Sequence, residues 1–205
     1  MGYILRFNRK ILLIFLVAFV GFGWVRYDIP IGNRDAIELT LDIASDEMGK
    51  KELTGKNDGE HITKYMNATG LSGSRGYPYC AAGLVWCLKT ATDSLNIKYP
   101  FAKRSAVANY HFDYAKKNGI KVVSKPVRGG FLVWKSDNSY SGHVEIIKEV
   151  VTSVEVVTLG FNTSNGKTGS QREGNGNFER TRYLKSFLGR LRLRGVVGFS
   201  EYCKL

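Results

Sequence analysis

One cysteine and one histidine in this sequence stand where nucleophilic chemistry is favoured. Cys80 begins the segment CAAGLVWCLKTATDSL, whose apolar residues recur at helical spacing, so it lies at a predicted helix start. The positive end of a helix dipole lowers the pKa of a thiol there. His143 lies in an alternating segment typical of a strand, and an imidazole can pair with a thiolate and protonate a leaving amine. With the free N–H groups of the first helical turn as oxyanion donors, these parts suit amide hydrolysis through an acyl-enzyme.

A third polar residue can fix the orientation of the imidazole. Residues 143–151 and 154–162 alternate as two strands, and residues 152–153 between them predict a hairpin turn. In that register Asn162 lies opposite His143, and a slip of one residue would mix the two faces. The other face of the hairpin carries the apolar residues Val144, Ile146, Val157, Leu159 and Phe161. We therefore predict a triad of Cys80, His143 and Asn162.

The remaining periodicity predicts helices first and a sheet afterwards. Apolar spacing predicts helices near residues 37–48, 80–95 and 105–119, and alternation predicts strands at 131–135, 143–151 and 154–162. This order indicates an α+β fold, in which a helix with the nucleophile at its start packs on an antiparallel sheet.

Composition narrows the function classes. The chain has 205 residues, 43% of them hydrophobic, which excludes a disordered chain. Its net charge of +12 favours polyanionic partners, and Arg190, Arg192 and Arg194 alternate along one side of a predicted strand. The stripe is either a solvated strand face or a contact for anionic wall polymer or lipid headgroups, whereas nucleic acid is a weaker alternative because no recognised binding module accompanies the charge.

Cysteine and histidine usage argues against a disulfide framework and a metal site. Three cysteines are an odd number, so at least one thiol is free. Cys87 lies two helical turns after Cys80, too far to bridge it, and is expected to pack in the core. A disulfide between Cys87 and Cys203 outside the cytoplasm stays open, and nothing in the sequence requires it. His111 is expected in the core or at a groove edge. The histidines are scattered and no CxxC or HExxH motif occurs, so we expect neither metal nor cofactor.

The N-terminus has the layout of an export signal. Residues 11–25 are apolar and free of charge, and Arg6, Arg9 and Lys10 precede them. This predicts a signal anchor or signal peptide over residues 1–30 and one catalytic domain over residues 31–205. The basic flank predicts a single pass through the cytoplasmic membrane with the domain outside the cytoplasm, or export if the signal is cleaved.

The motifs around these residues resemble a known family. YCAAGLVWCL is similar to the nucleophile helix of CHAP (cysteine, histidine-dependent amidohydrolase/peptidase) domains and their NlpC-type relatives. GHVEII resembles the strand that carries the family's histidine, and TLGFNTS resembles the segment with its polar third residue. The resemblance spans roughly residues 35–185 and implies a papain-like fold, with Cys80 as nucleophile, His143 as base and Asn162 as orienting residue.

One departure from the family pattern concerns the third member of the site. Many members carry an acidic residue two places before this asparagine, where this chain has Gly160. Glu145 lies across the predicted hairpin from that glycine, and whether its carboxylate compensates stays open at this stage.

The resemblance implies a peptidoglycan hydrolase. It would cleave an amide of a stem or cross-bridge peptide, or the muramoyl-alanine amide, with peptidoglycan as its partner. Two alternatives stay open. One is a catalytically silent module that binds or assembles the cell wall, and the other is a papain-like acyl transferase. A silent module needs neither Cys80 nor His143, whereas a transferase differs only in the group that accepts the acyl chain.

Overall fold

The computed structural model describes residues 34–120, 122–166, 174–184 and 187–198. Its helices are α2 (Arg34–Asp46), α3 (Glu60–Ala68), the 3-10 helix η1 (Gly73–Arg75), α4 (Cys80–Ser94) and α5 (Ala108–Lys117). Its strands are β1 (Val122–Val123), β2 (Phe131–Ser136), β3 (Gly142–Val150), β4 (Glu155–Thr163), β5 (Gly176–Tyr183), β6 (Phe187–Leu188) and β7 (Leu191–Val197). The predicted α+β class is confirmed, because the helices come first and the strands form one antiparallel sheet.

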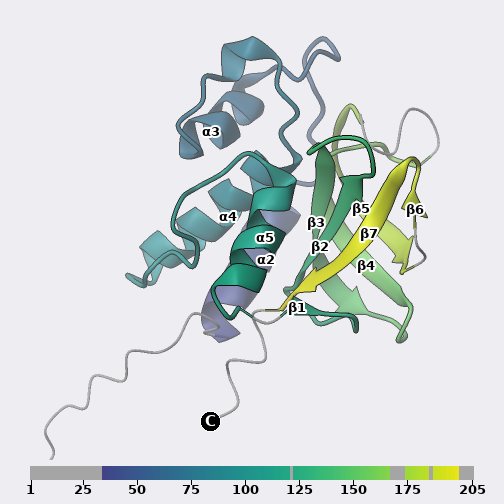
Figure 1. Cartoon of the computed structure of the whole chain (residues 1–205). Helices are drawn as coiled ribbons and strands as arrows, with labels where there is room; N and C mark the ends of the chain where they lie inside the picture. The colour runs from purple at the N-terminus through teal and green to yellow at the C-terminus, as the bar shows by residue number, and fades with distance from the viewer. Residues whose placement is uncertain (1–33, 121, 167–173, 185–186, 199–205) are drawn as a thin grey trace, which may run out of the picture.

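Helices α2, α4 and α5 lie together on one side of the sheet (Figure 1). Apolar side chains of α2 and α4, among them Leu41, Leu84 and Leu88, form one buried cluster with Val144 and Phe161 of the sheet. Burial of this surface is the main stabilising contribution to the arrangement.

A glycine brings α4 close to the sheet. A Cβ on Gly83 would lie 2.3 Å from ring atoms of Phe161 on β4, so only glycine allows this approach. Because Gly83 is in the first turn of α4, the same contact sets the position of Cys80 at the start of that helix.

The sheet has the strand order β1-β7-β2-β3-β4-β5, and β6 pairs with β7. The strands predicted at residues 131–135, 143–151 and 154–162 are β2, β3 and β4, and the predicted strand with the alternating arginines corresponds to β7. The predicted hairpin register holds at the pair Glu145–Gly160. In the part of the hairpin closer to the turn, a bulge between Ile147 and Glu149 shifts the register. The connection between the two strands is residues 151–154, two residues longer than predicted.

The predicted pairing of His143 with Asn162 does not form. Pairing of β3 with β4 begins at Glu145 and Gly160, and the register of β4 with β5 is interrupted between Gly160 and Thr163. Asn162 lies in this interruption with a φ of 49°, in the left-handed region that asparagine tolerates better than most residues. The irregular backbone therefore turns Asn162 out of the register that alternation predicts.

The arginine stripe also differs from the prediction. Arg190 lies in the turn before β7, while Arg192 and Arg194 lie on the strand. Arg192 pairs with Asp137 at 3.3 Å, and Arg194 pairs with Asp113 at 2.7 Å. Two of the three charges therefore have acidic partners within the domain.

Among the described residues, no helix is long and apolar enough to cross a membrane. The apolar run at residues 11–25, on which the predicted anchor rests, lies outside the described residues, and so does Cys203.

Candidate active site

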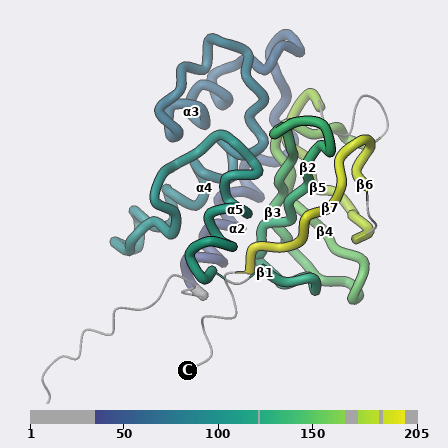
Figure 2. Tube along the Cα trace, viewed as in Figure 1, coloured from purple at the N-terminus to yellow at the C-terminus, as the bar shows by residue number. Residues whose placement is uncertain are grey.

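Cys80 is the first residue of α4 and borders a groove of about 450 Å3. Its residue is only 6% exposed, so its accessible surface faces that groove. The other walls are the segment before α4, the start of α5 and the loop between β2 and β3. The trace in Figure 2 shows this loop beside the start of α5, where Asn109 Nδ2 donates to the Tyr140 carbonyl at 3.0 Å.

His143 is fully buried and is coupled to Cys80. Burial by itself raises the pKa of the Cys80 thiol, but the interaction with His143 outweighs it and lowers that pKa. Backbone N–H groups of Val144 and Ala81 act in the same direction. The arrangement therefore favours the thiolate, the nucleophilic form of cysteine.

The imidazole of His143 is correspondingly easier to protonate. Burial opposes its charge, yet the contacts with Cys80 and Glu145 together raise its pKa to about 9. Nε2 of His143 lies 3.0 Å from Oε1 of Glu145. Nδ1 is buried and has no hydrogen-bond partner among the described residues, so it is the ring nitrogen that is available to Cys80. The geometry suits a thiolate and imidazolium pair with Glu145 behind the imidazole.

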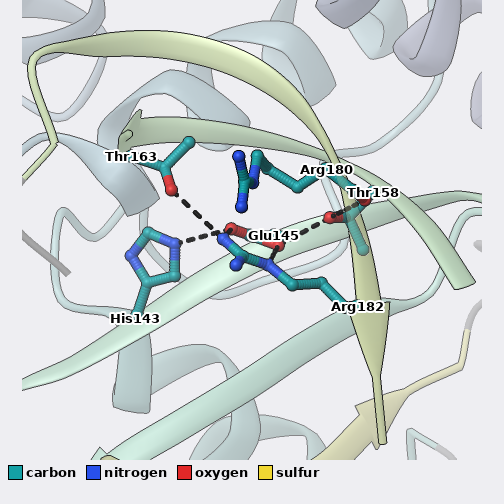
Figure 3. Close-up of polar contacts among 6 residues, drawn as sticks. All are labelled: His143, Glu145, Thr158, Thr163, Arg180 and Arg182. Carbon is teal, nitrogen blue, oxygen red and sulfur yellow. Dashed lines mark hydrogen bonds and ion pairs between the residues drawn. The ribbon is translucent and has the colours of Figure 1, made fainter. Parts of the chain in front are cut away.

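Glu145 is fixed from several directions (Figure 3). Nε of Arg182 donates to its Oε2 at 2.9 Å, and Nη2 donates to its Oε1 at 2.5 Å, which is a two-pronged ion pair. The hydroxyl of Thr158 donates to Oε2 at 2.6 Å. Arg182 is held in turn, because its Nη2 also donates to Thr163 at 3.1 Å.

Glu145 stays ionised despite complete burial. Desolvation raises the pKa of a buried carboxyl, but the Arg182 charge, with further help from His143, lowers the pKa of Glu145 far below its ordinary value. A buried carboxylate held in this way both orients the imidazole and stabilises its positive charge, as the third member of a catalytic triad does.

The first turn of α4 supplies backbone donors next to the sulfur. The helical ladder begins with the N–H of Gly83 donating to the carbonyl of Tyr79 at 2.9 Å, so earlier N–H groups have no acceptor within the helix. Tyr79 makes no side-chain cap to them. N–H groups at this position can stabilise an oxyanion that forms on a carbonyl attacked by Cys80.

Asn162 contacts the segment before the nucleophile rather than the imidazole. In the orientation that satisfies both atoms of its amide, Asn162 accepts from the N–H of Tyr79 at 3.1 Å and donates to the carbonyl of Gly174 at 3.0 Å. Of the three predicted residues, the structure thus brings Cys80 and His143 together, while Glu145 holds the place at Nε2 expected for Asn162.

Two further thiol and imidazole groups lie in the core. Cys87 is a buried free cysteine, and burial raises its pKa well above the ordinary value. His111 packs edge-on against Phe101 at 4.8 Å between ring centres, and burial lowers its pKa to about 4. Within the part of the chain that the structure describes, no group of three His, Cys, Asp or Glu side chains is arranged to hold a metal ion.

Arg182 and Thr158 were not found from the sequence. The opposition of Glu145 and Gly160 in the hairpin register was the one available signal for the carboxylate, and the structure keeps that pair. Arg182 lies on β5, a strand that the alternation pattern missed, so nothing in the sequence linked it to Glu145.

These features define an α+β domain with a cysteine at a helix start, coupled to a buried histidine and carboxylate. Residues 72–162 match the family model of the CHAP domain. The matched segment contains Cys80, His143, Glu145 and Asn162. This match confirms, for this part of the chain, the resemblance to CHAP domains, a family of peptidoglycan amidases and peptidases, that the sequence motifs predicted. Neither the curated proteins nor the solved structures contain a significant match to the chain.

Proposed function

We propose that this protein is a thiol-dependent peptidoglycan hydrolase that cleaves an amide bond through an acyl-enzyme. Cys80 is the nucleophile, His143 the acid and base, and Glu145 the residue that orients and charges the imidazole. The observation that supports this most is the coupling of Cys80, beside an open groove, to the fully buried pair of His143 and Glu145.

In this mechanism the thiolate of Cys80 attacks the carbonyl carbon of the amide. The negative charge that develops on the carbonyl oxygen is stabilised by free N–H groups at the start of α4. His143 then protonates the leaving amine, the C–N bond breaks, and a thioester remains on Cys80. His143, now neutral, removes a proton from water, which attacks the thioester and releases the acid.

Glu145 stays ionised throughout, because Arg182 compensates its charge. A silent wall-binding module has no use for a lowered thiol pKa or a buried imidazole and carboxylate pair. An acyl transferase would share every step to the thioester and differ only in the acceptor.

The proposed location follows from the N-terminal segment. Residues 11–25 hold the enzyme in the cytoplasmic membrane, and residues 31–205 lie outside the cytoplasm with access to peptidoglycan. Reporter fusions at the C-terminus test this topology. If a C-terminal reporter that works only in the cytoplasm is active, the topology is refuted. N-terminal sequencing of the mature protein distinguishes an anchor from a cleaved signal.

Digestion of purified sacculi, followed by mass spectrometry of the fragments, tests the activity. We expect soluble fragments from the native protein and none from Cys80→Ala or His143→Ala. Cys87→Ala is the matched control, since Cys87 is a second cysteine of α4 that is buried away from the groove. Full activity of Cys80→Ala would refute the proposal, and fragments joined to an added amine in place of water would indicate a transferase.

A further inference from the structure

The groove beside Cys80 is lined by uncharged residues. Apart from the thiolate of Cys80, its lining side chains among the described residues carry no charge, and they include Leu71, Tyr77, Val107 and Tyr140. Each of these four is at least 40% exposed. Large apolar side chains that gather around a concave surface mark a binding site more than scattered ones do. The groove therefore offers an apolar surface directly beside the nucleophile.

Tyr140 is an exposed ring on a fixed support. Its residue is 53% exposed, yet its hydroxyl donates to Oδ2 of Asp113 at 2.6 Å and its carbonyl accepts from Asn109 at 3.0 Å. Arg194 ties the two supports together, donating to Asn109 at 3.0 Å and to Asp113 at 2.7 Å. A ring held in this way contacts a ligand with little loss of conformational entropy.

Positive charge lies outside the groove, beside its two tyrosines. Arg75 Nη1 lies 3.4 Å from the hydroxyl of Tyr77, and Arg75 is exposed. Nζ of Lys135 lies 5.7 Å from the centre of the Tyr140 ring. Asp113, the acid at this rim, has Arg194 and Tyr140 as partners. A ligand thus meets neutral surface near the sulfur and cations further out.

A carboxylate in the neutral part of the groove would lose water without gaining a charged partner, which is costly. An uncharged group loses little there and gains contact with apolar surface. At the rim the preference is reversed, because Arg75 and Lys135 attract anions.

We propose that this groove selects scissile amides whose acyl residue is uncharged, with substrate carboxylates held further out at the Arg75 and Lys135 rim. The inference rests on the proposed function and narrows its substrate. In peptidoglycan, the muramoyl-alanine amide and D-alanyl cross-link amides have uncharged acyl residues. The γ-D-glutamyl amide carries a free carboxylate on its acyl residue and is disfavoured. Tyr77, Val107 and Tyr140 are the residues that determine this specificity.

Three synthetic stem peptides of equal length test the proposal. They differ only in the acyl residue of one amide, which is D-alanyl, γ-D-isoglutaminyl or γ-D-glutamyl, so that the last two differ only in charge. Binding is measured with the full-length Cys80→Ala protein, and kcat/KM with the native protein. We expect the γ-D-glutamyl peptide to bind about tenfold more weakly than the γ-D-isoglutaminyl peptide, and its kcat/KM to be about tenfold lower. Equal or tighter binding of the charged peptide would overturn the proposal.

A charge placed in the groove gives a second measure. Val107→Lys adds a cation at an exposed groove position, and Val154→Lys adds the same charge at an exposed position in the β3–β4 turn. The ratio of kcat/KM for the neutral peptide to kcat/KM for the charged peptide should fall about fivefold in Val107→Lys and stay unchanged in Val154→Lys. An unchanged ratio in Val107→Lys would count against the proposal. Selective binding without any cleavage would refute the proposed hydrolase but support the inferred selectivity.

Discussion

Gly160 on β4 leaves the space that the carboxylate of Glu145 on β3 occupies. The two residues are paired across the hairpin, and a Cβ on Gly160 would lie 2.7 Å from Oε1 of Glu145. Oε1 is also the atom that faces His143 Nε2. The position where many family members carry an acid is therefore empty in this chain, and an acid from the neighbouring strand reaches the same imidazole.

Gly160→Ala should impair catalysis more than folding. The added methyl group displaces Oε1 of Glu145, whose position is otherwise fixed by Arg182 and Thr158. We expect kcat to fall about tenfold or more, since a misplaced orienting group costs turnover. The measurement is release of soluble fragments from sacculi together with thermal unfolding. Native turnover in Gly160→Ala would show that the carboxylate does not need this position.

Part of this site follows from local sequence patterns. The helical spacing after Cys80 and the alternation around His143 depend on neighbouring residues only, and the structure places both residues where these patterns predict. The pair Glu145–Gly160 follows from the separation of polar and apolar faces, which a register slip would destroy.

The remainder depends on contacts that no local pattern encodes. Asn162 leaves the predicted register because the backbone turns left-handed within an irregular pairing of β4 with β5. Arg182 reaches Glu145 only because β5 pairs with β4, and the polar sequence of β5 does not alternate like a half-buried strand. The short strands β1 and β6 are set by their partner β7.

Glu145→Gln should reduce turnover more than Asn162→Ala. Glutamine keeps the shape of Glu145 but removes the charge that stabilises the imidazolium, whereas Asn162 contacts the backbone before Cys80. We expect a loss of about a hundredfold for Glu145→Gln, and for Asn162→Ala about tenfold together with lower stability. Asn162→Asp should also be destabilised, because a carboxylate cannot donate to the Gly174 carbonyl. Steady-state kinetics rank the variants, and the reverse order would assign the orienting role to Asn162.

The pH dependence of kcat/KM should be bell-shaped. The thiolate exists above the pKa of Cys80, which lies below its ordinary 9.0, and the imidazolium exists below the pKa of His143, about 9. Activity therefore falls as the pH rises through about 9, because His143 loses the proton that the leaving amine requires.

Glu145→Gln should move the alkaline limb of that profile to lower pH. The variant removes a carboxylate that raises the pKa of His143, so the imidazole loses its proton earlier. Asn162→Ala is the matched control and should leave the limb in place. Rates measured from about pH 5 to pH 11 decide this. If the alkaline limb lies at the same pH in Glu145→Gln and in the native protein, Glu145 does not raise the pKa of His143.

Removing Arg182 should expose the cost of burying Glu145. Arg182→Met leaves the carboxylate without its cation, and we expect the free energy of unfolding to fall by about 3–5 kcal/mol. The double variant Arg182→Met, Glu145→Gln should recover most of this loss, since no unpaired charge remains. Urea unfolding of the four proteins completes the cycle. Additive losses would mean that the two residues are not coupled.

The two described cysteines should differ strongly in reactivity. Cys80 has a lowered pKa and borders the groove, whereas Cys87 is buried with a raised pKa. Because the thiolate is the form that alkylates, iodoacetamide at about pH 7 should label Cys80 at least about a hundredfold faster than Cys87 in the folded protein. Mass spectrometry of digested samples measures each site separately.

Two controls connect that reactivity to the site. In denaturant both cysteines should react at similar rates, because burial and the His143 contact are lost together. His143→Ala should slow labelling of Cys80 in the folded protein at pH 7, since the contact that lowers the thiol pKa is gone and burial, which raises it, remains. If Cys80 is labelled at the same rate in His143→Ala and in the native protein, the imidazole does not activate the thiol. The helix dipole would then be the source of its reactivity.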